Sequence, residues 1–334
     1  MSKTPLTIND IAEALNVSAS TVSRALKDNP CINVNTRERI KQYAREHHFQ
    51  PNKQAVELRA GSNQVIGVII PSFVNYFFSS VLSGLDSVMS EHGYRMIVAQ
   101  SNDDYEREVQ IANTFLQLRL SGIIVSLGKN TKQYDHFKAF TEHEIPLVFF
   151  DRICTELNTD RVVVDDYAGT YAAVEHMIQT GCRNIYFYGS PPHLEISKNR
   201  RNGYLDAMHK YGITVTDDMM PFCDNRSDAI SLTKKLLSLP RKPDGFFAVN
   251  DSTATGILYS CKLMGFKVPD DVSICGFAGE NISEITDPLL TTVEQKGEEV
   301  GQYAFDMLLA QINGEEHPNK MVVRTKLLLR ETTK

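Results

Sequence analysis

Leu6-Thr-Ile-Asn-Asp-Ile-Ala-Glu-Ala-Leu-Asn-Val-Ser-Ala-Ser-Thr-Val-Ser-Arg-Ala25 has the pattern of two short helices joined by a tight turn. Thr7 can cap the first helix together with Asp10, three positions later. Four apolar residues then recur on one face at helical spacing: Ile8, Ile11, Ala12 and Leu15. Asn16 can take the left-handed conformation that ends this helix, and Ser18 can cap the next. The stretch therefore predicts a compact helix-turn-helix unit.

The second helix of this unit has a polar outer face, because Val22 and Ala25 face inward. Its outward residues are Ala19, Ser20, Thr21, Ser23 and Arg24. Ser18 and Thr21 are short donors suited to phosphates, and a guanidinium such as that of Arg24 suits guanine. The same pattern also fits a generic three-helix bundle with a polar surface.

A third helix is expected from Asn33, as cap, through the segment 36–48, and Pro51 would end it. Its core-facing residues would be Ile40, Tyr43 and Ala44. Residues 1–62 contain nine Lys and Arg against six Asp and Glu, a net charge of +3. Because the whole chain carries −6, the remaining residues carry −9. This collection of basic charge at one end favours a nucleic-acid partner.

The motif Thr-Ile-x-Asp-Ile-Ala, then Val-Ser-x-x-Thr-Val-Ser-Arg, then Thr-Arg-Glu-Arg resembles the headpiece of the lactose-repressor (LacI/GalR) family of bacterial transcription regulators. The resemblance implies that Ala19, Ser20 and Arg24 read bases and that Leu58 enters the minor groove. The remaining candidate DNA contacts, mainly to the backbone, are Thr7, Ser18, Thr21, Asn33, Thr36 and Asn52. Some members of the family have a large side chain where this chain has Ala19. Their operator preference therefore cannot be transferred to this chain.

The segment 52–60 has helical composition but lies between Pro51 and Gly61. A helix shorter than roughly 12 residues is marginal in water by itself. We expect a symmetry mate and a DNA groove to stabilise it, with Leu58 as the apolar wedge that opens a base step. Leu58→Ala should then abolish high-affinity operator binding and leave effector binding intact. The alternative interpretation is an ordinary frayed linker.

From Gly61 onward, apolar strands alternate with amphipathic helices. Strands are expected at 64–70, 95–100, 122–126, 146–151, 162–165, 184–188, 245–249 and 272–277. Helices are expected at 77–92 and 106–119, and from about 167, 197, 228, 252 and 294. This alternation predicts an α/β fold with parallel sheets covered by helices on both faces.

This arrangement resembles the two-lobed type I periplasmic-binding-protein fold, which serves as the effector domain in the same family. With the headpiece at 1–50 and a hinge helix and linker at 51–62, the resemblance covers essentially the whole chain. The effector-binding and dimerisation domain would span 63–334. Its N-lobe would comprise about 63–162 and 291–322, and its C-lobe about 163–290 and 323–334.

The residues that follow the strands are candidates for effector binding, because ligands gather at the carboxyl ends of parallel strands. Acidic, amide and guanidinium groups beside aromatic rings suit a polyhydroxylated ligand. The candidates, mostly supported by the family resemblance, are Asn75, Tyr76, Phe77, Asp151, Arg152, Arg200, Asn250, Asp251 and Asn281. Two alternatives stay open: Asp251 as the cap of a helix from Ser252, and Tyr76 and Phe77 as first-turn packing.

One position departs from the family. Many relatives place a ligand-binding Asp where this chain has Ala278. Asn281 or Glu280 can substitute for it. Two arginines can also bind a carboxylate or phosphate bidentately, so a sugar, a sugar acid and a sugar phosphate all remain open as effectors.

No catalytic or metal-binding motif competes with this interpretation. The Asp165-Asp166 pair, where a strand meets its helix, is expected to cap that helix. The six cysteines lack a Cys-x-x-Cys spacing and favour buried free thiols. We expect no cofactor. With no signal peptide and no long apolar run, the sequence predicts a cytoplasmic protein without membrane contact.

The sequence thus predicts a ligand-switched, sequence-specific DNA-binding regulator, a repressor of a carbohydrate-utilisation operon. A homodimer would occupy two half-sites of a pseudo-palindromic operator. The chain has no additional leucine heptads after 326–330, which favours a dimer over a tetramer. The alternatives are a sugar-processing enzyme with an accessory DNA-binding domain and a binding protein without a regulatory role.

Overall fold

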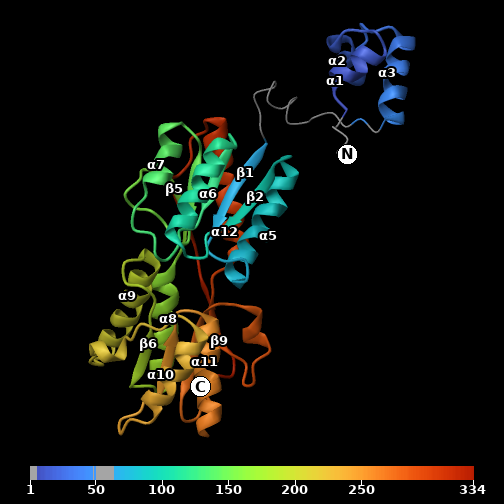
Figure 1. Cartoon of the computed structure of the whole chain (residues 1–334). Helices are drawn as coiled ribbons and strands as arrows, with labels where there is room; N and C mark the ends of the chain where they lie inside the picture. The colour runs from blue at the N-terminus through green and yellow to red at the C-terminus, as the bar shows by residue number, and fades with distance from the viewer. Residues whose placement is uncertain (1–5, 48, 50–63) are drawn as a thin grey trace. The chain divides into compact units, whose positions relative to one another are not determined.

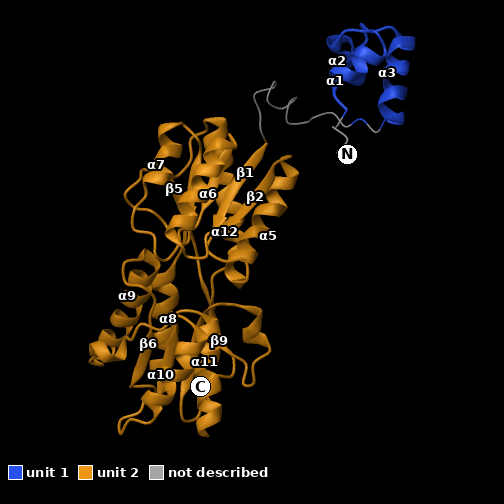
Figure 2. Ribbon diagram, viewed as in Figure 1, with its two compact units in different colours: residues 1–63 blue, residues 64–334 orange. Residues whose placement is uncertain are grey.

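The computed structural model describes residues 6–47, 49 and 64–334. The chain divides into two compact units, residues 1–63 and 64–334 (Figure 2). The predicted hinge segment, with Asn52 and Leu58, lies outside the described residues. In the described parts of the chain, no helix has the length and apolar character needed to cross a membrane.

The described residues of the first unit form three helices: α1 (Ile8–Ala14), α2 (Ala19–Leu26) and α3 (Val34–Glu46). The predicted capping box is confirmed, since the Thr7 backbone N–H donates to Asp10 Oδ2 over 2.7 Å and Asp10 N–H donates to Thr7 Oγ1 over 3.2 Å. Asn16 has a φ of 52°, as predicted for the residue that ends α1. The apolar core contains the fully buried residues Ile11, Val22, Ala25 and Ile40. Helix α3 ends at Glu46, two residues before the expected end.

The second unit is built as two lobes, each with one central sheet (Figure 1). The first sheet has the order β10-β5-β4-β3-β1-β2, with all neighbours parallel. Its strands are β1 (Val65–Ile70), β2 (Arg95–Gln100), β3 (Gly122–Val125), β4 (Leu147–Phe150), β5 (Asp160–Val164) and β10 (Lys320–Val323). Its helices are α5 (Tyr76–Glu91), α6 (Tyr105–Gln117), α7 (Asp135–Glu142) and α12 (Gly297–Asn313). One face of the sheet packs on α5 and α12, and the other on α6 and α7.

The second sheet has the order β11-β9-β8-β7-β6. Its strands are β6 (Ile185–Tyr188), β7 (Gly245–Ala248), β8 (Ser273–Ala278), β9 (Thr291–Glu294) and β11 (Lys326–Leu328). Strand β11 pairs antiparallel with β9, so this sheet is not purely parallel as predicted. The helices are α8 (Asp166–Gln179), α9 (Glu195–Lys210), α10 (Arg226–Leu237) and α11 (Asp251–Met264), with 3₁₀ turns η1 (Asp217–Met219) and η2 (Asn281–Glu284).

Two sequence-based boundaries need correction. The helix expected from about 294 begins at Gly297, because Thr291–Glu294 form strand β9 of the second sheet. The second crossing between the lobes therefore follows Glu294, three residues after the expected position of about 291. Strand β5 keeps residues up to Val164 in the first sheet, and the last crossing lies between Val323 and Lys326. Helix α7 was not predicted at all.

Helices α5 and α12 pack so closely that glycines on each helix lie against the backbone of the other. A Cβ on Gly84 would lie 2.1 Å from the Glu298 carbonyl oxygen, and one on Gly301 would lie 2.2 Å from the Val81 carbonyl oxygen. Both contacts are shorter than any real Cβ approach, so only glycine fits at these positions. The close packing joins a helix from the end of the chain to the start of the same lobe.

Five of the six cysteines are buried, as predicted, and Cys31 is exposed.

Candidate functional site

The described residues predicted to contact DNA lie on α2 and at the starts of the three helices. Ser18 caps the helix by accepting the Thr21 N–H over 3.1 Å, and its Oγ lies 2.8 Å from both Ser20 Oγ and Thr21 Oγ1. Ser20 and Arg24 are exposed. Thr7, Asn33 and Thr36 lie at or near the starts of α1 and α3, where Thr7 and Asn33 are caps. Because Val22 and Ala25 are buried, the polar side of α2 faces outward.

The second unit contains a cleft of about 380 Å³ between its two lobes. Six predicted effector residues line it: Asn75, Phe77, Asp151, Arg152, Arg200 and Asn250. Three others do not: Tyr76, Asp251 and Asn281. Glu280, which the sequence offered as an alternative to Asn281, also lines the cleft, whereas the sequence missed other lining groups, among them Asp103, Lys129, Asp224 and Gln295. The carboxyl ends of the parallel strands thus meet at one cavity, as the strand-end argument predicts.

The aromatic wall of the cleft belongs to the first turn of α5. Asn75 caps this helix through Oδ1, which accepts N–H groups from Phe77 at 3.0 Å and Phe78 at 3.4 Å. The Phe77 and Phe78 rings pack edge to face at 5.6 Å, and both are buried. The Arg152 guanidinium lies 5.6 Å from the Phe78 ring centre. First-turn packing and a position on the cleft wall are therefore compatible for Phe77.

Arg152 and the loop that carries Lys129 are held by Asp103. Asp103 Oδ1 accepts Arg152 Nη1 at 2.6 Å and the Lys129 backbone N–H at 2.8 Å. The same loop is supported from behind by the fully buried Glu108, which accepts Gly128 N–H at 2.7 Å and Thr131 Oγ1 at 2.8 Å. These contacts fix the position of Lys129 at the rim of the cleft.

Asp151 follows β4 and adopts a φ of 56°, a conformation that Asp tolerates better than most residues. It is 5% exposed, and its Oδ2 lies 4.0 Å from Arg152 Nε. That distance is too long for a hydrogen bond. Burial raises the pKa of Asp151, and the nearby Arg152 and Arg200 only partly oppose this.

Arg200 on α9 is fixed by three groups. Its Nε and Nη2 lie 2.8 and 2.7 Å from Asp166 Oδ1, and its Nη1 donates to the Val249 carbonyl over 2.6 Å. The guanidinium also lies 3.8 Å from the centre of the Phe277 ring. The expectation that Asp165 and Asp166 both cap a helix is half right: Asp165 caps α8, whereas Asp166 is buried and binds Arg200. Burial raises the pKa of Asp166 to about 6.

Asn250 and Asp251 have different roles. Asn250 caps α11 by accepting the Thr253 N–H over 2.7 Å, and its Nδ2 donates to the Asp224 carbonyl over 3.0 Å. Asp251 is not the cap that the sequence left open, because α11 already begins with it. Its carboxylate accepts Thr292 Oγ1 at 2.6 Å and the Glu280 N–H at 2.7 Å. Asp251 therefore holds the turn after β8 and does not line the cleft.

This turn brings Glu280, and not Asn281, to the cleft. Ala278, where many relatives have an Asp, lines the cavity with a φ of 126°, while Asn281 is exposed at the start of η2. Burial, with a contribution from Asp251, raises the pKa of Glu280 to about 7. Gln295 is 4% exposed, and its Nε2 is buried without a hydrogen-bond partner in the structure.

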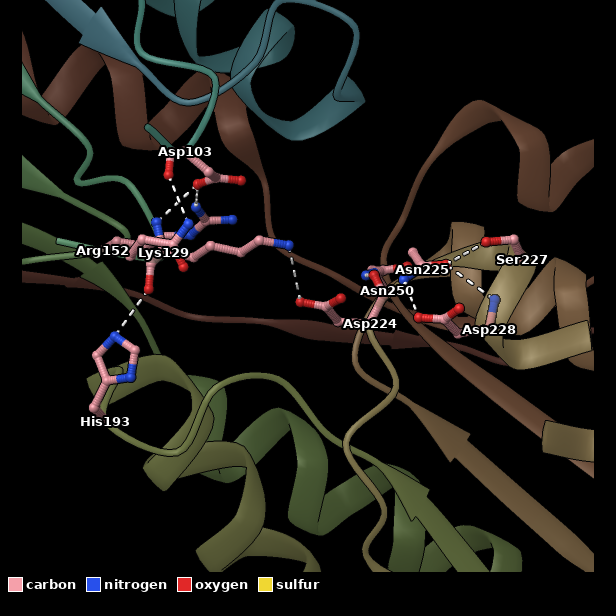
Figure 3. Close-up of polar contacts among 10 residues, drawn as sticks. Asp103, Lys129, Arg152, His193, Asp224, Asn225, Ser227, Asp228 and Asn250 are labelled. Atoms are coloured by element: carbon pink, nitrogen blue, oxygen red, sulfur yellow. Dashed lines mark hydrogen bonds and ion pairs between the residues drawn. The ribbon is translucent and has the colours of Figure 1, made fainter. Parts of the chain in front are cut away.

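Two contacts cross the cleft from the loop after β3 (Figure 3). Lys129 Nζ lies 3.5 Å from Asp224 Oδ2 in the other lobe. The Lys129 carbonyl accepts a hydrogen bond from His193 Nε2 over 2.9 Å. Asp224 is in turn bound to Asn250 at the start of α11. The two lobes are therefore joined by polar contacts of modest strength that can break and re-form.

Comparison with known proteins decides the family. The sequence pattern of the bacterial regulatory proteins of the lacI family matches residues 7–52, and that of the periplasmic binding protein-like domain matches residues 174–333. The ribose operon repressor of Halalkalibacterium halodurans is 30% identical over 334 residues, covering 98% of this chain and 97% of the relative. The chain belongs to the LacI family of bacterial regulatory proteins.

Other LacI-family proteins match over the same length. The transcriptional repressor CytR of Escherichia coli K12 is 28% identical over 337 residues, covering 99% of this chain and 97% of CytR. The crystal structure of the lac repressor dimer bound to operator and the anti-inducer ONPF shares the fold, with a TM-score of 0.85 and 22% identity over 99% of both chains. These relatives are transcription regulators and not enzymes. The predicted ligand-responsive DNA-binding repressor is thus confirmed.

Proposed function

We propose that this LacI-family repressor binds a pseudo-palindromic operator as a homodimer and that a sugar or sugar-derived effector in the cleft switches the complex. The observation that carries the proposal is the cleft itself, because its hydrogen-bonding groups come from both lobes. A ligand held by Asn75 and Asp151 on one side and Arg200 and Asn250 on the other would interact differently with the open and closed arrangements. Only such a difference in affinity can shift the equilibrium between them.

On the DNA side, we propose that Ala19, Ser20 and Arg24 contact bases. The exposed position of Ser20 and Arg24 on α2 supports this assignment. Six further residues, Thr7, Ser18, Thr21, Asn33, Thr36 and Asn52, would contact mainly the backbone, and Leu58 would enter the minor groove. Helix starts such as those of α1, α2 and α3 present backbone N–H groups, which suit phosphates.

The proposed dimer would use an apolar surface of the second lobe. Tyr259 and Leu263 are one turn apart on α11, and Ile282 and Ile285 belong to or follow η2. Leu263 is 56% exposed and Ile285 is 76% exposed. Tyr259 and Ile282 line the same shallow hollow, so the two elements form a continuous surface. Apolar surface of this kind favours a protein partner, and a second copy is the partner that a pseudo-palindromic operator requires.

The energetics of switching are demanding. To shift the repressor from mostly operator-bound to mostly free of operator, the effector's binding free energies for these two forms must differ by about 5 kcal/mol, summed over the dimer. A ligand that contacts both lobes can supply this through several hydrogen bonds. The relative named ribose operon repressor supports a small sugar as the effector class, which is carried over to this chain as part of the proposal.

The test combines DNA and ligand binding in the full-length protein. An operator selected from a random DNA library is titrated with and without each sugar that raises the melting temperature. We expect at least one such sugar to change operator affinity by tenfold or more. If sugars bind but operator affinity is the same in every case, the switching proposal is wrong.

The dimer is tested separately. Leu263→Glu should lower the mass found by analytical ultracentrifugation to that of a monomer and weaken operator binding, because it places charge in the proposed apolar interface. Leu118→Glu, at an exposed leucine of the other lobe, is the matched control. An unchanged dimer in Leu263→Glu, or a monomeric wild type, would contradict the proposed surface.

A further inference from the structure

The positive groups of the cleft are already neutralised. Lys129 lies 3.5 Å from Asp224, and Arg152 binds Asp103 at 2.6 Å. Arg200 binds Asp166 at 2.7 Å, and its Nη1 is committed to a backbone carbonyl. An anionic ligand would have to compete with these carboxylates. A phosphate or sugar acid therefore meets no guanidinium that is free to bind it bidentately.

Two carboxylates of the cleft lack such compensation. Asp151 forms no closer ion pair than that with Arg152 Nε, 4.0 Å away, and Arg152 and Arg200 only partly compensate its charge. Glu280 uses its backbone N–H, not its side chain, in the contact with Asp251. Within the described residues, neither side-chain carboxylate has a hydrogen-bond donor. The cleft thus presents two acceptors from opposite lobes, one after β4 and one after β8.

The charged side chains that line the cleft include more acidic than basic groups. Three cations, Lys129, Arg152 and Arg200, face four anions, Asp103, Asp151, Asp224 and Glu280. Asp166 and Asp251 add negative charge directly behind the wall. Burial raises the pKa values of Asp151 and Glu280, the latter to about 7, because nearby cations do not offset the loss of water. A cationic ligand would compensate the charged carboxylates for the water that burial removes from them.

Two residues that line the same cavity also carry unsatisfied donor groups. Among the residues that the structure describes, the buried donors Gln295 Nε2 and Arg152 Nε have no hydrogen-bond partner, and both residues line the cleft. Buried polar groups are normally satisfied, so such groups at a cavity wall indicate a ligand that completes them. Their natural partners are hydroxyl oxygens. The ligand should therefore carry hydroxyl groups as well as a positive charge.

We propose that the effector is an amino sugar, whose protonated amino group binds between Asp151 and Glu280 and whose hydroxyl groups accept from Gln295 and Arg152. This proposal rests on the proposed function and names the ligand class of its cleft. A neutral sugar can donate hydroxyl hydrogen bonds to both carboxylates but leaves their charge uncompensated. An ammonium group compensates that charge, and the Coulomb attraction between opposite charges is stronger at a buried site than in water, which favours the amine.

Isothermal titration of the full-length protein tests the ligand class with matched compounds. The panel contains the 2-amino, the unmodified and the 6-phosphate forms of glucose, galactose and mannose. We expect an amino sugar to bind tightest, about tenfold or more above its neutral parent, as a difference near 1.4 kcal/mol gives. A phosphate or a neutral sugar as the tightest ligand would overturn the proposal, and so would the absence of binding by any compound at 10 mM.

Variants then test the two acceptors. Asp151→Asn and Glu280→Gln should each remove most of the amino sugar's advantage over its neutral parent. Glu316→Gln, at an exposed glutamate, is the control that keeps it. Retention of the full preference in both cleft variants would refute their role. Operator titration without sugar is run in parallel, because loss of operator binding would contradict the proposed function and not the ligand class.

Discussion

Arg200 binds Asp166 through one carboxylate oxygen, with Nε and Nη2 at 2.8 and 2.7 Å from Oδ1. The pair joins the start of α8 to the middle of α9 and, through the Val249 carbonyl, to the end of β7. Both side chains are buried. The pair therefore fixes a cleft-lining guanidinium from behind, in the lobe that contains α8, α9 and β7.

We expect Asp166→Ala to destabilise the second unit strongly. Removing one partner of a buried ion pair leaves the other charge uncompensated, which costs about 3–5 kcal/mol of unfolding free energy. Asp165→Ala is the matched control, because it removes only the cap of α8 and should cost about 1 kcal/mol. Urea unfolding followed by circular dichroism measures both. Equal losses in the two variants would show that the Arg200 contact contributes nothing beyond capping.

Glu280→Gln should make stability less dependent on pH. Burial raises the pKa of Glu280 from 4.5 to about 7 in the folded protein. The folded state therefore binds this proton more tightly than the unfolded state does. The stabilisation that protonated Glu280 contributes below pH 4.5 is lost as the pH rises through 7. Relative to wild type, the variant should gain at most about 3 kcal/mol between pH 5 and pH 8. Melting curves at both pH values check this, and parallel pH profiles would refute it.

The sequence predicted those elements whose pattern is local. Strand β2 occupies the predicted residues 95–100, because an apolar run between turn residues determines it. Strand β9 was missed because Thr291–Glu294 is short, and its burial depends on pairing with β8 and β11. Helix α7 lacks the usual local signal, since Tyr134 provides no side-chain cap.

The same limit applies to the cleft. The ends of strands indicated Asp151, Arg152 and Asn250, all of which line it. Asp166 looked like a second cap residue, and only its contact with Arg200, 34 positions later, gives it another role. Glu280 reaches the cleft because Asp251 holds its backbone, a contact between residues 29 positions apart. Non-local contacts of this kind leave no periodic signal in the sequence.

Glu108→Gln should loosen the loop that carries Lys129. Glu108 is fully buried and accepts hydrogen bonds from Gly128 N–H, Thr131 Oγ1 and His136 Nε2. An amide replaces one acceptor with a donor, which leaves a buried group unsatisfied at a cost of about 1–3 kcal/mol. Hydrogen exchange of the Gly128 amide should accelerate by tenfold or more. Glu106→Gln, exposed on the same helix, should leave the exchange rate unchanged; an equal acceleration there would contradict the prediction.

Arg24→Ala should weaken specific operator binding more than binding to unrelated DNA. Arg24 is exposed on α2, where a guanidinium that binds guanine contributes about 1–3 kcal/mol of discrimination. Arg45→Ala, at an exposed arginine in the last turn of α3, removes the same charge from a different helix and is the control. Fluorescence anisotropy with the selected operator and a scrambled duplex, at fixed salt, separates the effects. If Arg24→Ala weakens both duplexes equally, then Arg24 contacts phosphate only, because a lost base contact must reduce the ratio of the two affinities.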